Sequence, residues 1–257
     1  MLINYQEYQA MFEVEDRMWW YKTLHDRVIH EIKAASPAYR DLHILDAGCG
    51  TGGLLTRLQA EGMTRLRGFD YNAYAVEFSE SRGLPVSRKD ITALDYPAES
   101  FDVVISNDVL YQFDDPELTD ALRGIYRVLK PGGLFITNNN AFRVFGGIHD
   151  LAVGSKRRFV KADFDRFLAL FPGFRVEKAT YWSLLLSPLI LGVRLFQKLQ
   201  LRLGWIRAEE VRSDVSLPSP AINDFLYRVC TLERRLLRRA PFGSSLFLVI
   251  RKDDVSQ

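Results

Sequence analysis

A glycine-rich segment, Ile44-Leu45-Asp46-Ala47-Gly48-Cys49-Gly50-Thr51-Gly52-Gly53, has the composition of a loop that lies against a ligand. An apolar run leads into the glycines, and an amphipathic stretch follows them. Glycine permits positive φ and leaves bare main chain against which a ligand can lie. The free N–H groups at the start of the following helix suit a carboxylate or a phosphate. The segment therefore predicts a ligand site where a strand turns into a helix.

Acidic residues placed around this loop would bind the parts of an adenosyl compound. Asp70 ends the second predicted strand, about twenty residues after the loop, where a carboxylate can accept both hydroxyls of an adenosine ribose. Asp46 precedes the glycines, where it can orient the loop and, through water, an ammonium group. Asp90 and Ile91 follow the third predicted strand, where an adenine edge would lie.

The glycines alone leave other interpretations open. Gly48, Gly50 and Gly53 also satisfy the G-x-G-x-x-G pattern of dinucleotide sites, which would suit a nicotinamide-dependent oxidoreductase. A second interpretation is a purely structural strand-to-helix turn that binds no ligand. A third interpretation is a non-catalytic adenosyl-binding scaffold at a membrane or dimer interface. The Leu-Lys-Pro-Gly-Gly element at 129–133 counts against the oxidoreductase.

The elements that must position these residues alternate between short apolar runs and amphipathic stretches from residue 42 onward. Such alternation predicts a parallel sheet with helices on both faces. The predicted strands are 42–45, 66–69, 84–87, 103–106, 134–138, 174–181 and 245–251. The predicted helices are 4–34 (one or two helices), 53–59, 72–82, 116–129 and 159–170.

Together these motifs resemble those of the class I S-adenosylmethionine-dependent methyltransferases. The matching elements are LDAGCGTG at 45–52, the acids Asp70 and Asp90, FDVVIS at 101–106 and LKPGG at 129–133. The resemblance covers roughly residues 40–180 and the final strand, and its combined motifs are far more specific than the glycine loop. It implies an α/β fold with a Rossmann-like seven-stranded, mostly parallel sheet of order 3-2-1-4-5-7-6. It also implies S-adenosyl-L-methionine as cofactor and S-adenosyl-L-homocysteine as product, bound by Asp46, Gly48, Cys49, Gly50, Asp70, Tyr71, Asp90, Ile91 and Asn107.

The chain divides into three predicted parts. Residues 1–36 form an N-terminal helical lid, 37–181 and 243–257 form the cofactor-binding core, and 182–242 form a helical cap or insert. Glu7, Glu13, Glu15 and Asp16 are expected on the polar side of the N-terminal helices.

Three consecutive aromatic residues, Trp19-Trp20-Tyr21, are the unusual feature of the lid, because neighbours on a helix lie about 100° apart and cannot all face one side. One interpretation is simple packing on the domain. The other places an aromatic ring near the sulfonium, where cation–π attraction acts, with Tyr21 near the methionyl carboxylate and Trp19 and Trp20 against the acceptor.

Candidate catalytic residues follow the fourth and fifth strands. Tyr111 and Asn107 are expected at the reaction centre. His149 lies in a glycine-flexed loop at the ligand-binding edge of the sheet and is the candidate general base, with Asp150 as its orienter. Arg158 would bind an acidic group of the substrate. The alternative for His149 is a hydrogen bond within its own loop.

The insert alternates leucine clusters with arginines, and three uses stay open: a cap that walls an apolar acceptor pocket, a dimer interface, or peripheral membrane contact through 182–207. Glu233 and the neighbouring arginines are expected on a solvated helix face.

Composition sets the remaining limits. The 257 residues are 47% hydrophobic and 26% charged, as in an ordinary soluble globular protein. A net charge of +2 disfavours a nucleic-acid partner, and two distant cysteines disfavour disulfides or a metal site. With no predicted signal peptide and no apolar run long enough to span a bilayer, a cytoplasmic monomer or homodimer is expected. We expect methyl transfer to a small, largely apolar acceptor, natural-product or isoprenoid/lipid-like, whose accepting atom the sequence does not specify.

Overall fold

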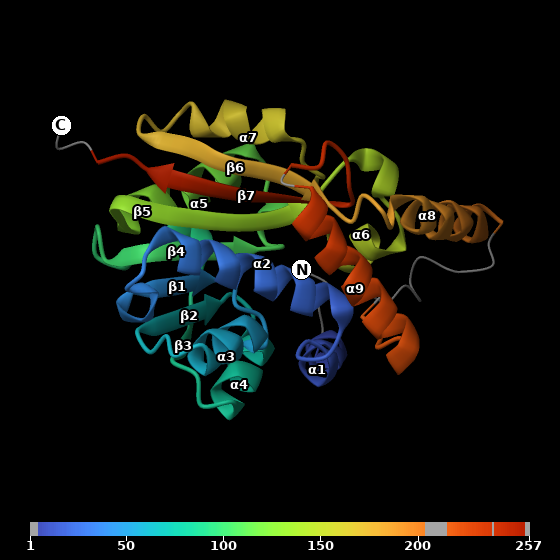
Figure 1. Ribbon diagram of the computed structural model, residues 1–257. Coiled ribbons are helices and arrows are strands. Elements are labelled where there is room, and N and C mark those ends of the chain that lie inside the picture. Colours follow the sequence, from blue (N-terminus) through green and yellow to red (C-terminus); the bar gives the residue numbers. More distant parts are fainter. Residues whose placement is uncertain (1–4, 204–214, 238, 255–257) are drawn as a thin grey trace.

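The computed structural model describes residues 5–203, 215–237 and 239–254. Its centre is a seven-stranded sheet of order β3-β2-β1-β4-β5-β7-β6, in which all neighbouring strands are parallel except β7, which runs antiparallel to β5 and β6 (Figure 1). The predicted strand order is therefore confirmed. The strands are β1 Ile44–Ala47, β2 Leu66–Asp70, β3 Val86–Arg88, β4 Phe101–Asn107, β5 Leu129–Asn140, β6 Phe174–Trp182 and β7 Ser245–Lys252.

Alternate residues of the central strands enter two separate apolar layers. Leu45 and Val104 lie with the helices of one face, whereas their neighbours Ile44 and Val103 lie with those of the other. This period of two follows from the opposite directions of successive side chains in a strand. The helices are α1 Tyr5–Val14, α2 Trp19–Ala35, α3 Gly53–Ala60, α4 Ala73–Ser81, α5 Asp115–Val128, α6 Ile148–Ala152, α7 Lys161–Leu168, α8 Ser187–Arg202 and α9 Pro220–Leu236. Helices α5 and α7 cover the first face, and α2, α3 and α9 cover the second.

The boundary between α5 and β5 differs from the prediction. Helix α5 begins with a capping box, in which Asp114 accepts from the Glu117 N–H and Glu117 accepts from the Asp114 N–H, each at 3.0 Å. The helix ends at Val128, and β5 already starts at Leu129 because that residue pairs with Phe101 of β4. The LKPGG element is thus the beginning of the strand rather than a turn before it.

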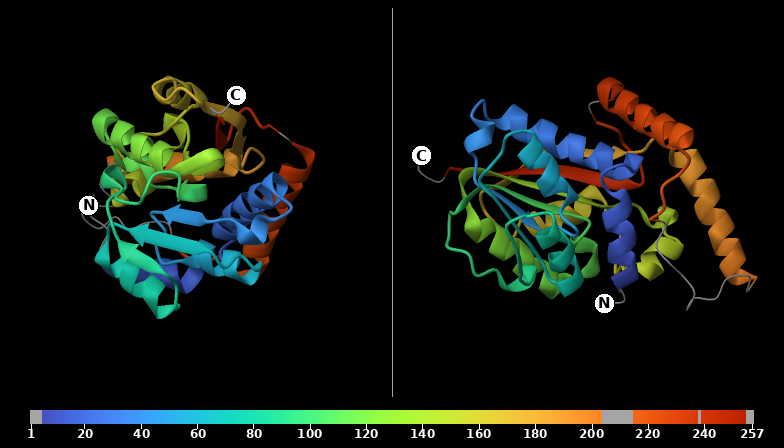
Figure 2. Two further views of the ribbon diagram at one scale, coloured as in Figure 1. Left: turned by 90° about the vertical axis from the view of Figure 1, so that its left-hand side faces the viewer. Right: turned by 90° about the horizontal axis from the view of Figure 1, so that it is seen from below.

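The described part of the predicted helical insert contains α8 and α9, which lie differently on the molecule (Figure 2). Helix α9 packs along α2, whereas α8 projects from the body of the protein. The prediction for Glu233 is wrong: its side chain is buried and accepts hydrogen bonds from the N–H groups of Ser183 and Leu185, both at 2.9 Å. It thereby joins α9 to the segment that leads into α8.

Candidate active site

The glycine loop has the positive-φ backbone that its composition predicts. Gly48 and Gly50 have φ values of +85° and +54°, a region that side-chain-bearing residues rarely enter. A Cβ atom on Gly48 would lie 2.3 Å from a methyl group of Val109, so the loop backbone packs directly on the segment that follows β4. The loop thus brings the ends of β1 and β4 to one edge of the sheet.

Asp70 stands at the end of β2 and holds this loop. One carboxylate oxygen accepts from the Gly50 N–H at 3.0 Å, and the other accepts from the Asn72 N–H at 2.9 Å. Burial raises the pKa of the Asp70 carboxyl above its usual range, and the backbone hydrogen bonds oppose that shift. The residue expected to bind a ribose therefore also fastens the glycine loop.

The predicted adenine contacts lie on the same wall. Asp90 accepts from the Thr92 N–H and hydroxyl, at 2.9 and 2.8 Å, and so caps the short helix Ile91–Ala93. Ile91 is buried, whereas Tyr71 is largely exposed, and all of these residues line one cavity. The structure brings together the acid and the apolar residue that the sequence places after β3.

Two polar side chains lie beside the glycine loop. Among the described residues, the Asn107 side-chain oxygen is buried without a hydrogen bond. The Asp46 carboxyl is buried, and burial, then the charges of Asp70 and Glu15, raise its pKa to about 8. Buried polar groups in proteins are nearly always paired, so the Asn107 oxygen is available to a bound molecule. Cys49 lies beside them and is also buried.

The N-terminal helices form the other wall. Glu15 is buried, so its expected place on a polar face is wrong. Its carboxylate accepts a hydrogen bond from the Thr51 hydroxyl and pairs with Arg82 at 2.8 Å. A Cβ atom on Gly53 would lie 2.6 Å from a Glu15 oxygen, so glycine is required where the N-terminal segment meets the start of α3. Burial raises the pKa of Glu15 to about 7.

The three consecutive aromatic residues all contact the cavity, because α2 begins at its rim. Trp20 also packs on Trp182, with ring centroids 5.7 Å apart. This side chain therefore both packs on the domain and lines the cavity. Tyr21 is half-buried, and burial of its phenol and the nearby carboxylates of Glu15 and Asp108 raise the phenol pKa.

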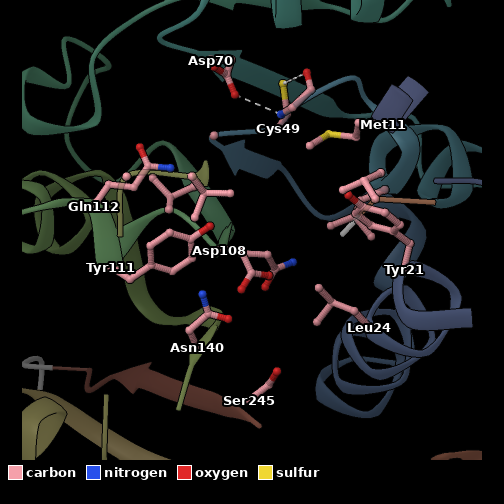
Figure 3. Close-up of a pocket in the computed structure, with 18 of the residues that line it drawn as sticks. Met11, Tyr21, Leu24, Cys49, Asp70, Asp108, Tyr111, Gln112, Asn140 and Ser245 are labelled. Atoms are coloured by element: carbon pink, nitrogen blue, oxygen red, sulfur yellow. Dashed lines mark hydrogen bonds between the residues drawn. The ribbon is translucent and has the colours of Figure 1, made fainter. Parts of the chain in front are cut away.

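Asp108, a residue that the sequence did not single out, faces the middle of the cavity. Figure 3 shows Asp70 and Cys49 towards one end, Asn140 and Ser245 towards the other, and Asp108 between them. Its backbone has a φ of +57°, a conformation tolerated by aspartate and found at functional sites. The Asn138 amide donates to both carboxylate oxygens, at 3.2 and 3.0 Å, and itself accepts from the Trp182 indole at 2.8 Å.

The electrostatics of Asp108 suit a proton acceptor. Burial raises the pKa of its carboxyl to about 7, and the Asn138 hydrogen bond and the positive charge of Arg158 partly oppose that shift. Tyr111 lines the same region and is buried, and the charge of Asp108 adds to the effect of burial in raising the pKa of its phenol.

The other predicted catalytic residues come from the segment after β5. His149 lies in helix α6 rather than in a loop, and its side chain is outside the described part of the structure. Asp150, predicted to orient His149, is instead paired with Arg158, which donates two hydrogen bonds to its carboxylate, at 2.8 and 2.7 Å. Arg158 lines the cavity, yet its guanidinium is occupied by Asp150 and by the Ala141 carbonyl at 3.0 Å.

The cavity that joins these groups has a volume of about 750 Å³, which falls in the range of small-molecule sites. Its first end carries the acids, the bare glycine backbone and the unpartnered Asn107 oxygen. This donor and acceptor set fits an adenosyl cofactor. Its second end is walled by aromatic and apolar side chains, among them Trp19, Trp20, Phe145 and Ile190.

Comparison with known proteins gives the same assignment. A family model described as a methyltransferase domain matches residues 45–137. A ubiquinone biosynthesis O-methyltransferase from Stutzerimonas stutzeri is 29% identical over 158 residues, which are 53% of this chain and 67% of that protein. A sterol 24-C-methyltransferase from Pneumocystis carinii is 33% identical over 100 residues, 36% of this chain and 26% of that protein. The chain spans less than a third of the length of several curated relatives that it matches.

A solved structure shares the fold. The geranyl diphosphate C-methyltransferase from Streptomyces coelicolor, in complex with Mg²⁺, geranyl diphosphate and S-adenosyl-L-homocysteine, superposes with a TM-score of 0.51 at 16% identity. The superposition covers 84% of this chain and 73% of that one. The methyltransferase domain at 45–137, the strand order and the acids of the cavity are those of a class I S-adenosylmethionine-dependent methyltransferase.

Proposed function

We propose that this protein transfers a methyl group from S-adenosylmethionine to a small, largely apolar acceptor. The observation that carries the proposal is the single cavity, which joins the cofactor acids at one end to an aromatic wall at the other. The sterol, ubiquinone-precursor and geranyl diphosphate methyltransferases to which the chain is similar are named for acceptors of that general kind.

Residues at the first end would hold the cofactor. Asp70 would accept the ribose hydroxyls, Asp90 and Ile91 would contact the adenine, and Asp46 would attract the ammonium group, through water. Asn107 has an unpartnered oxygen that would accept a hydrogen bond from the methionyl part. The cofactor supplies an activated methyl group, so the protein's main tasks are alignment and the exclusion of water.

Residues at the second end would hold the acceptor and take its proton. Trp19, Trp20 and Tyr111 would exclude water around an apolar acceptor. The Asp108 carboxylate would accept the proton of an acceptor O–H or N–H, because its pKa lies near neutrality and its position is fixed by Asn138. His149 stays a sequence-based prediction for the same role.

Binding and product analysis test this proposal separately. Calorimetry is expected to show binding of S-adenosylhomocysteine and not of NAD; the reverse result would favour the oxidoreductase interpretation. The protein is then incubated with a small-molecule extract and S-adenosylmethionine that carries a trideuteromethyl label. Mass spectrometry should find a labelled apolar metabolite, and binding without any labelled product would support the scaffold interpretation instead.

A further inference from the structure

Helix α8 carries a long apolar surface that the rest of the described protein does not cover. The helix extends beyond the body of the molecule in Figure 1 and in the right-hand view of Figure 2. Leu195 and Phe196 are 64% and 55% exposed. We define the outer face of α8 by its exposed apolar residues, which are Leu189, Val193, Leu195, Phe196, Leu199 and Leu203 just beyond its end. From Leu189 to Leu203 these apolar side chains extend over about 21 Å, at 1.5 Å per residue.

Another side of α8 packs against the rest of the protein. Ile190 and Arg194, one turn apart, line the large cavity, and a Cβ atom on Gly147 would lie 2.7 Å from the Arg194 side chain. The start of the helix is held as well, because the Ser187 hydroxyl donates to the Ser183 carbonyl at 2.8 Å and the Glu233 carboxylate accepts from Ser183. These contacts fix the rotation of α8, so its outer face is turned away from the cavity.

The charge on α8 is of one sign. Lys198 and Arg202 are exposed and follow Leu195 by three and seven positions, which places them beside it on the helix. The segment Ser187–Arg202 contains no Asp or Glu. Two copies paired through this face would bring like charges together, whereas an anionic surface would neutralise them. Apolar side chains flanked by basic ones are typical of helices that lie in the interface of a bilayer.

We propose that the outer face of α8 binds the surface of an anionic lipid bilayer. The helix would lie parallel to the membrane, with Leu195, Phe196 and their neighbours among the acyl chains and Lys198 and Arg202 at the phosphates. Among the described residues, no helix is long and apolar enough to cross a membrane. The contact includes most of the segment 182–207 named from the sequence, of which residues 204–207 lie outside the described part. The proposal does not depend on the identity of the acceptor.

Vesicle co-sedimentation with the full chain tests this binding. The protein is expected to sediment with phosphatidylcholine vesicles that contain phosphatidylglycerol and to stay in the supernatant with phosphatidylcholine alone. Replacing both basic residues (Lys198→Ala with Arg202→Ala) should weaken binding about 30-fold, equivalent to about 2 kcal/mol, since each cation near such a surface contributes about half of that. The change Phe196→Glu should abolish sedimentation, since it places a charge among the acyl chains.

Matched variants elsewhere on the surface are the controls. Leu170→Glu changes a leucine of similar exposure beyond the end of α7, and Arg123→Ala with Arg166→Ala removes two exposed arginines from α5 and α7. Both should bind vesicles like the unmodified protein, and circular dichroism verifies that each variant is folded.

Three outcomes would overturn the proposal. The first is an unmodified protein that fails to sediment with the anionic vesicles, and the second is control variants that lose binding as strongly as the α8 variants. The third is a dimer, measured by light scattering, that dissociates in Phe196→Glu while vesicle binding is absent. The outer face of α8 would then be an interface between copies of the chain.

Discussion

The Glu15 carboxylate accepts a hydrogen bond from the Thr51 hydroxyl, so the N-terminal helices are joined to the loop that would hold the cofactor. Arg82 of the loop after α4 completes this contact, pairing with Glu15 at 2.8 Å and with Asp16 at 2.9 Å. The N-terminal helices and the glycine loop therefore form one unit, and a change at Glu15 should affect both stability and cofactor binding.

Replacing Glu15 by alanine should lower the free energy of unfolding by about 1–3 kcal/mol, because the buried Thr51 hydroxyl and the Arg82 guanidinium would each lose a partner. Urea denaturation measures the change. Glu15→Gln keeps an acceptor for Thr51 and should cost less, and Glu13→Ala, on the exposed side of α1, should cost nothing. Equal stability of Glu15→Ala and Glu13→Ala would show that the contact contributes little.

Asp70→Ala should weaken the binding of S-adenosylhomocysteine by about 1.5–3 kcal/mol, the scale of a charge-assisted pair of hydrogen bonds. The loss has two sources, since the carboxylate would bind the ribose and also holds the Gly50 N–H. Calorimetry measures the affinity, with Asp95→Ala, an exposed acid nearby, as the control. An unchanged affinity in Asp70→Ala would place the ribose elsewhere.

The gathering of acids at one end of the cavity was predictable because the positions of these residues depend on local sequence. Each acid lies at or near the carboxyl end of a strand, and parallel strands bring these ends to one edge of the sheet, so Asp46, Asp70 and Asp90 meet there wherever the helices pack. The strand order was also predictable from the sequence, because the family resemblance implied it and the alternation of strands and helices agreed with it.

The residues that the sequence analysis misplaced or missed lie where the hydrophobic periodicity of a helix or strand stops or where the backbone turns. Glu15 was placed on a polar helix face, yet α1 ends at Val14 and the chain turns there, which carries Glu15 inward. Asp108 went unnoticed beside Asn107, because its direction into the cavity depends on a φ of +57° that no spacing of residue types reveals. Glu233 sits among arginines in the sequence, and only the fold brings two backbone N–H groups to it.

Stability should fall as the pH rises towards 8. Burial raises the pKa of Asp46 from 3.8 to about 8 and that of Glu15 from 4.5 to about 7, so the folded protein keeps protons that the unfolded chain has released. Each retained proton lowers the free energy of unfolding by up to about 1.4 kcal/mol per pH unit between the two pKa values.

Asp46→Asn should make this dependence shallower, and urea denaturation between about pH 5 and 8 measures it. The exposed Asp95→Asn is the matched control and should leave the slope unchanged. If Asp46→Asn and the unmodified protein have the same slope, Asp46 is ionised in the folded protein and the cavity is better hydrated than its burial indicates.

Asp108→Asn should lower kcat by about 10²–10⁴-fold while the affinity for S-adenosylhomocysteine stays near normal, if the acceptor bears an exchangeable proton. The asparagine keeps the shape of the side chain but cannot take up that proton. In the unmodified protein kcat should rise with pH through about 7, as the Asp108 carboxyl ionises, and the variant should lose this rise. The labelled metabolite identified above serves as the acceptor.

His149→Ala, measured with the same acceptor, separates the two candidate bases. If His149→Ala rather than Asp108→Asn loses activity and the neutral-pH rise, the base predicted from the sequence is correct and Asp108 has another role. A methyl transfer to an alkene carbon gives a third pattern, because no proton then leaves before the methyl group arrives. Replacing Trp20 or Tyr111 by leucine should in that case cost more activity than either base variant, because their rings would stabilise positive charge on the acceptor.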